Sequence, residues 1–179
     1  MEWQWEEGSY LYGKLPHYDT KKTFDAVCRE IQRFYQGKDS IKALKRKIRW
    51  TGKNIILEIA FGTSHSNLRE QFVGFEIISC TWAIDKSDMN RNGYLPFKHW
   101  SDFHYKKNFN VVKMNPFLFS DLIAAIEERI SFAKYMDTPE GFIEHINDYP
   151  MTPRYRVTDE PNVKVHYERM KKLLEAEKE

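Results

Sequence analysis

A loop of alternating oxygen-bearing side chains is the most specific local motif in the chain. Asp88, Asn90 and Asn92 stand at positions one, three and five of this loop, with Gly93 at position six and Leu95 at position eight. This spacing is typical of the opening of a calcium loop, which wraps oxygen ligands around one ion. The twelfth position is a histidine where a bidentate glutamate would complete the site. The competing interpretation is an Asn-rich turn, so we expect no cofactor and keep Ca²⁺ as the alternative.

The histidines and cysteines do not indicate a zinc or catalytic site. The two cysteines are far apart in the sequence and do not form a zinc-ligand pair, and the chain contains no Gly-rich phosphate loop and no Gly-x-Ser-x-Gly motif. Cys28 and Cys80 lie in apolar patterns, which predicts buried free thiols rather than nucleophiles. Free thiols suit a reducing compartment, so we expect a cytoplasmic protein. We expect no membrane partner, because no apolar run is long enough to span a bilayer.

Three carboxylates near the predicted central strands raise the alternative of metal-dependent phosphodiester chemistry. Glu58, Glu76 and Asp85 could hold Mg²⁺ at a phosphate, and Lys86 directly follows Asp85. The competing interpretation is that these carboxylates are the polar positions of alternating strands. Because no spacing separates the two interpretations, a nuclease remains only one form of a nucleic-acid-binding alternative.

Charge is distributed unevenly along the chain, although the net charge is only +2. Residues 38–54 carry seven cationic side chains and one acidic one, whereas residues 111–149 carry three cationic and seven acidic. The basic stretch and the aromatic stretch at 98–109 together offer phosphate contacts and rings for base stacking. The competing interpretation is a solvated strand face beside ordinary core aromatics. The candidate binding residues are Lys42, Lys45, Lys47, Arg49, Trp50, Lys53, His99, Trp100, His104, Tyr105, Lys106 and Lys107.

Two β-strands between Asn54 and Asp85 should form the centre that positions these residues. Apolar residues alternate with a period of two in both runs and occupy both faces, which is typical of central strands. The second run changes phase along its length, and we expect a bulge at Gly74 to allow this change. The segment Ile41 to Trp50 should be a preceding strand with an apolar inner face and a basic outer face.

Helices should cover this sheet. Apolar stripes at steps of three and four predict helices over 20–36 and 116–136, with Asn115-Pro116 as the start of the second. In the second helix, Arg129 should lie outside the apolar stripe. A shorter helix should begin at Pro139, and a last one near Asn162.

The resulting order is an aromatic ribbon at residues 2–13, a helix, antiparallel strands and then helices, which indicates an α+β fold. We expect one domain with a mostly antiparallel sheet of four or five strands. Residues 1–149 should form its core, and residues 150–179 a Pro-punctuated arm and terminal helix that pack on it or extend from it.

The absence of a catalytic motif in the sequence favours a small non-enzymatic binding protein. The abundance of aromatic residues and the uneven charge suit an inhibitor or immunity-type protein of a bacterium or phage, acting on a protein or nucleoprotein. The alternative is a nucleic-acid-binding protein, including a metal-dependent nuclease, that uses the basic strand at 42–53. The sequence leaves the oligomeric state open.

Overall fold

The computed structural model describes residues 10–11, 15–16, 20–63, 72–84, 95–96, 105–110, 116–148 and 161–177. Its strands are β1 (Tyr10–Leu11), β2 (Leu15–Pro16), β3 (Ile41–Leu44), β4 (Lys47–Thr51), β5 (Ile56–Thr63), β6 (Phe72–Ala83), β7 (Leu95–Pro96) and β8 (Lys106–Asn110). Its helices are α1 (Thr20–Tyr35), α3 (Pro116–Met136), α4 (Pro139–Asp148) and α5 (Pro161–Ala176).

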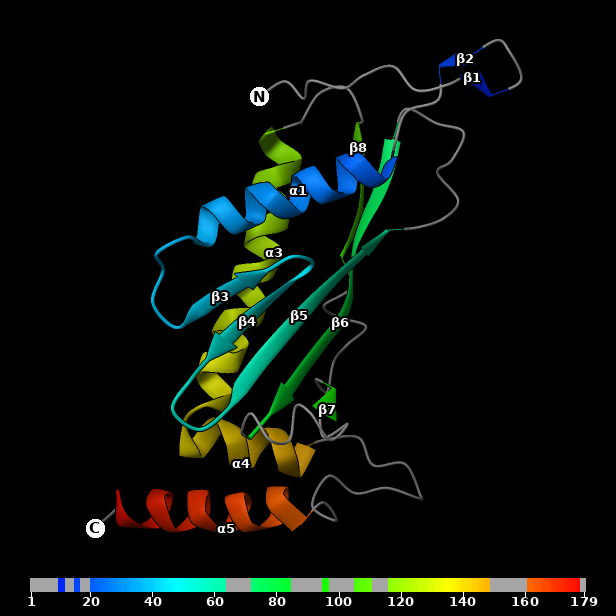
Figure 1. Ribbon diagram of the computed structural model, residues 1–179. Helices are drawn as coiled ribbons and strands as arrows, with labels where there is room; N and C mark the ends of the chain where they lie inside the picture. The colour runs from blue at the N-terminus through cyan, green and yellow to red at the C-terminus, as the bar shows by residue number, and fades with distance from the viewer. Residues whose placement is uncertain are drawn as a thin grey trace, which may run out of the picture.

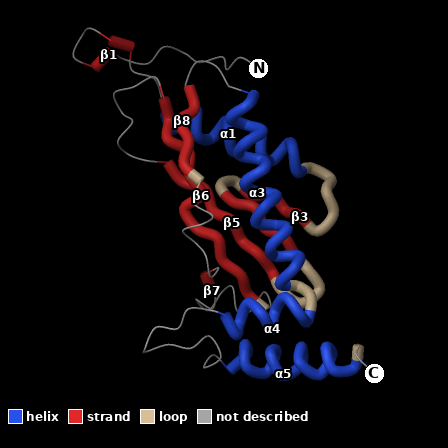
Figure 2. Tube along the Cα trace, turned by 180° about the vertical axis from the view of Figure 1, so that it is seen from behind, coloured by secondary structure: helices blue, strands red, loops and turns tan. Residues whose placement is uncertain are grey.

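One antiparallel sheet organises the fold. Its order is β3-β4-β5-β6, and β7 and β8 pair with opposite ends of the long strand β6. Figures 1 and 2 show α3 along one face of this sheet, with α4 and α5 beside each other at the end of α3. The predicted α+β class and antiparallel sheet are therefore confirmed, with five strands of four or more residues in the described part of the chain and the two-residue β7 paired beside β6.

The core lies between the sheet and the apolar stripes of α1 and α3. The ring of Phe24 on α1 lies 5.1 Å from that of Phe75 on β6, measured between centroids, and Trp82 lies 5.6 Å from Phe142 of α4. Both cysteines are buried and free, as the sequence predicted. None of the helices in the described part of the chain is long and apolar enough to cross a membrane.

The change of face in β6 occurs at a different residue from the one expected. The register between β5 and β6 shifts opposite Ala60 and Phe61, so that Ile78 is the extra residue. Gly74 instead pairs in regular register with β8. The prediction of a bulge at Gly74 was therefore wrong, because the apolar pattern changes phase between Ile77 and Ile78, where the bulge lies.

The basic segment expected as one strand forms two strands, β3 and β4, which are joined by a turn at Lys45–Arg46. The turn reverses the alternation, so Leu44 pairs opposite Lys47 and does not join Ile48 and Trp50 on the inner face. The expected single strand was wrong because this turn contains no glycine, proline or asparagine.

Arg129 also differs from expectation, because it lies inside the protein rather than outside the stripe of α3. Only 1% of the residue is exposed. Its Nη1 atom donates a hydrogen bond to the carbonyl of Ala125 at 2.5 Å, and burial lowers the pKa of Arg129 from its ordinary value. The long aliphatic part of an arginine can share an apolar face, which a pattern based on residue type does not reveal.

Asp137, directly after α3, ties the helices to the sheet. Its carboxylate accepts hydrogen bonds from the backbone N–H groups of Lys53, Asn54 and Ile55 at 2.8, 2.6 and 2.9 Å. The Asn54 side chain donates to the Asp137 carbonyl at 2.6 Å and accepts a hydrogen bond from Arg169 of α5 at 3.4 Å. We call this arrangement the Asp137 clamp.

Two predicted segments lie mainly outside the described residues. Of the aromatic ribbon at 2–13, the structure describes only the pairing of β1 with β2. The arm at 150–160 also falls outside, whereas α5 packs on α4, with the rings of Phe142 and His166 4.8 Å apart.

Candidate anion-binding groove

A groove of about 550 Å³ lies between the second half of α1 and the edge strand β3. Three polar residues of α1, at positions i, i+3 and i+4, face it together with Gln36, which directly follows the helix; that spacing corresponds to one side of a helix. Gly37 has φ 77°, a left-handed conformation that glycine adopts easily, and it ends the helix so that the chain turns back into β3. The lining residues are Arg29, Gln32, Arg33, Tyr35, Gln36, Gly37, Ile41, Lys42 and Ala43.

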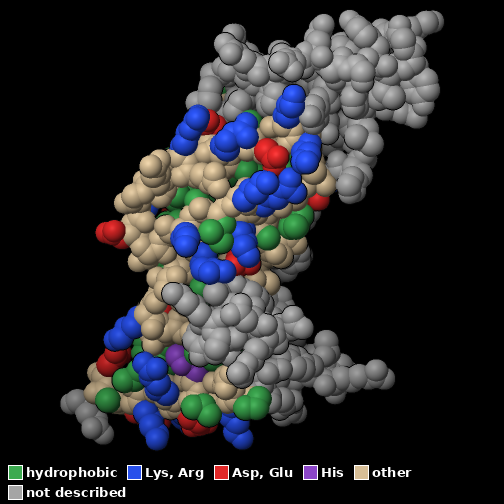
Figure 3. Space-filling model, viewed as in Figure 1, with side chains coloured by type: hydrophobic (Ala, Val, Ile, Leu, Met, Phe, Trp, Pro, Cys, Tyr) green, Lys and Arg blue, Asp and Glu red, His purple; other side chains and the backbone are tan. Residues whose placement is uncertain are grey.

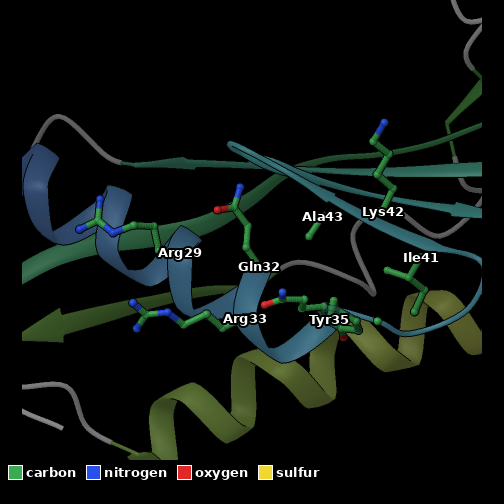
Figure 4. Close-up of a pocket in the computed structure, with 9 residues that line it drawn as sticks. Arg29, Gln32, Arg33, Tyr35, Ile41, Lys42 and Ala43 are labelled. Atoms are coloured by element: carbon green, nitrogen blue, oxygen red, sulfur yellow. The ribbon is translucent and has the colours of Figure 1, made fainter.

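The cationic side chains of the groove are exposed. In the described part of the chain, neither Arg29 nor Lys42 makes an ion pair within 4 Å. Arg33 pairs with Glu30, yet 68% of the Arg33 side chain remains exposed. Figure 4 shows Arg29, Gln32 and Lys42 extending to the same side, away from α3. These three side chains can therefore reach one ligand from two structural elements.

The positive charge continues from the groove onto the outer face of the sheet. Lys42 pairs opposite Arg49 in β4, which pairs opposite Glu58 in β5. The two carboxylate oxygens of Glu58 accept hydrogen bonds from Lys47 Nζ and Arg49 Nη2, both at 2.9 Å. One carboxylate thus faces two cations, which leaves this part of the sheet positive. Figure 3 shows Lys and Arg side chains gathered over α1 and the β3–β4 hairpin.

The apolar lining of the groove is largely occupied by internal packing. Tyr35 is only 1% exposed, and burial, together with the negative charge of Glu127, raises the pKa of its hydroxyl. Ile41 and Ala43 are half-buried and pack against the core. A ligand can therefore reach hydrogen-bond donors beside the exposed parts of Ile41 and Ala43.

The structure separates the binding residues that the sequence predicted. Only Lys42 lines the groove, whereas Lys45 and Lys53 are exposed elsewhere on the hairpin and the following turn. The ring of Trp50 and that of Tyr105 are buried, at 5% and 6% exposure, and do not present a face for stacking. Lys106 and Lys107 are exposed on β8, which lies toward the opposite edge of the sheet from β3. Outside the described residues lie His99, Trp100, His104, Asp88, Asn90 and Asn92.

The sequence analysis did not identify the polar groove residues of α1, nor Gln36, which directly follows the helix. Their common helical face was a usable signal, because Arg29, Gln32, Arg33 and Gln36 follow the spacing of one side of a helix. The packing of that face beside β3 depends on the turn after Gly37, which the spacing alone does not reveal.

The carboxylates considered for metal chemistry do not converge. Glu76 of β6 pairs opposite Gly62 of β5, which lies four residues along β5 from Glu58. The two carboxylates are therefore offset by about 13 Å along the strand direction. Asp85 lies outside the described residues. Among the residues that the structure describes, no three His, Cys, Asp or Glu side chains are grouped so that they could hold a metal ion.

Compared with known proteins, the chain matches no family model, no curated protein and no solved structure.

Proposed function

We propose that this chain is a small non-enzymatic binding protein that holds an acidic partner in the groove between α1 and β3. The observation that carries the proposal is the pair of exposed cations, Arg29 and Lys42, which extend to the same side of the groove without an ion-pair partner among the described residues. An inhibitor or immunity-type protein of a bacterium or phage, acting on an acidic protein or a nucleoprotein, would use such a surface.

Three other cations of the β3–β4 hairpin differ from Arg29 and Lys42, because each of the three has an ion-pair partner within the chain. Arg46 pairs with Asp25 at 3.0 Å, and Glu58 engages both cations that face it on β4. These pairs fix the hairpin against α1 and β5, so their charges serve the fold. Arg29 and Lys42 have no such role in the described part of the chain, and clustered unpaired cations attract acidic ligands.

The two thiols also agree with a binding role. Burial raises the pKa of the Cys28 thiol to about 12 and that of Cys80 further. Both thiols therefore stay protonated near neutral pH, and a protonated thiol is a poor nucleophile.

Charge reversal in the groove tests the proposal. The groove variant, Arg29→Glu with Lys42→Glu, should lose binding to acidic polymers, with fluorescently labelled poly-glutamate and an oligothymidylate as probes. The control variant, Lys164→Glu with Lys172→Glu, changes the net charge equally on exposed residues of α5. Binding to at least one probe by the wild type and the control variant, but not by the groove variant, would support the proposal. Equal binding by all three proteins, or none by the wild type, would refute it.

A further inference from the structure

We infer that the acidic partner is a nucleic acid, held in the groove by its phosphodiester backbone and not by its bases. This inference rests on the proposed function, because it names the partner of the same groove.

Donors from two structural elements line one side of the groove, which suits contacts to a chain of phosphates. Arg29 and Gln32 are three residues apart on α1, about 4.5 Å along its axis, and Figure 4 shows both on the side to which Lys42 extends. Lys42 adds a cation from β3. Arginine, lysine and glutamine side chains are common donors to phosphate oxygens, and the arginine fork suits phosphate geometry.

An acidic protein segment would find little to anchor it in this groove. Protein interfaces usually centre on apolar or aromatic residues that fill buried pockets. Here Tyr35 is already buried in the core, and Ile41 and Ala43 are half-buried by contacts within the chain. The groove therefore offers charge and hydrogen bonds along its length without a central apolar pocket, as expected for contacts to a phosphate backbone.

The aromatic rings nearby are not placed to read or stack bases. The Trp50 side chain is buried in the core on the inner face of β4. Phe34, on the same helix, is 41% exposed, but the Lys38 ammonium lies 3.8 Å from the centroid of its ring. Binding through the groove should therefore depend on salt and be nearly indifferent to base sequence.

The salt dependence of oligonucleotide binding tests this inference. With two phosphate contacts, from Arg29 and Lys42, affinity for an oligothymidylate of about 20 nucleotides should fall about sevenfold between 50 and 200 mM salt. Arg29→Gln with Lys42→Gln removes both contacts, so affinity should change by less than about twofold over the same range. Lys164→Gln with Lys172→Gln should behave as the wild type. All four replaced side chains are exposed, so the variants should stay folded. Circular dichroism melts would verify this.

The two proposals fail in distinguishable ways. If poly-glutamate binds through the groove and the oligonucleotide does not, the nucleic-acid inference is overturned and the proposed function stands. If neither polymer binds, both are overturned. A strong preference between oligothymidylate and oligoadenylate, or no difference in salt dependence between the wild type and the groove glutamine variant, would contradict backbone binding through these residues.

Discussion

Replacement of Asp137 by alanine should destabilise the protein strongly, because the Asp137 clamp joins the sheet to the helices. The carboxylate accepts three backbone N–H groups in the turn before β5. Lys53 is exposed, so water can replace its lost partner, whereas Asn54 and Ile55 are 7% and 1% exposed. Each buried N–H left without an acceptor costs about 1 to 3 kcal/mol, so the two together should cost about 2 to 6 kcal/mol.

Urea unfolding followed by tryptophan fluorescence would measure this loss. Asp137→Asn keeps one side-chain acceptor and should lose less than Asp137→Ala. Asp39→Ala removes an exposed carboxylate after α1 and should change the free energy of unfolding by less than about 0.5 kcal/mol. A loss below about 1 kcal/mol for Asp137→Ala would refute the reasoning, because water would then satisfy both buried donors.

Three further predictions concern other parts of the molecule. Burial, and to a smaller extent Arg169, lowers the pKa of His166 below 6.5, so the unfolded chain binds more protons than the folded one at acid pH. The contribution of His166 to stability should therefore be fully present above its ordinary pKa of 6.5 and be lost as the pH falls below it, and urea titrations of His166→Phe should show a weaker fall in acid. Glu58→Gln should strengthen binding of acidic polymers several-fold, because it removes the negative charge beside two cations on β4, and anisotropy titrations would contradict this if affinity fell. Cys28 and Cys80 should react with a thiol reagent at pH 8 only after unfolding, and rapid labelling of the native protein would show that a thiol is accessible.

The helices and the central strands could be predicted because local signals mark them. The Asn115-Pro116 pair and the apolar stripe behind it predicted the bounds of α3, Pro116–Met136, as the structure has them. The turn at Lys45–Arg46 could not be predicted in this way. Arg46 is held by Asp25 and lies 5.1 Å from the centre of the Phe24 ring, so contacts with α1 stabilise a turn that has no turn-forming residue.

The candidate site was harder to predict, because it depends on pairings between distant segments. The seven cations at 38–54 suggested a basic strand, but Glu58 engages two of them across the β4–β5 pairing. In the Asp137 clamp, the bonded residues are separated by 82 to 84 positions in the sequence, and no local pattern indicates such a contact. Burial and partners of charged residues follow from the tertiary fold rather than from composition.

Mapping of amide chemical shifts by NMR during titration with an oligothymidylate would test the central claim most directly. We expect the largest changes at the side-chain amides of Gln32 and Gln36 and at the backbone of Lys42, which line the groove. Residues of α5, at the far end of the molecule, should not change. Changes centred on Lys106 and Lys107 of β8 or on α5, with an unaffected groove, would contradict the account.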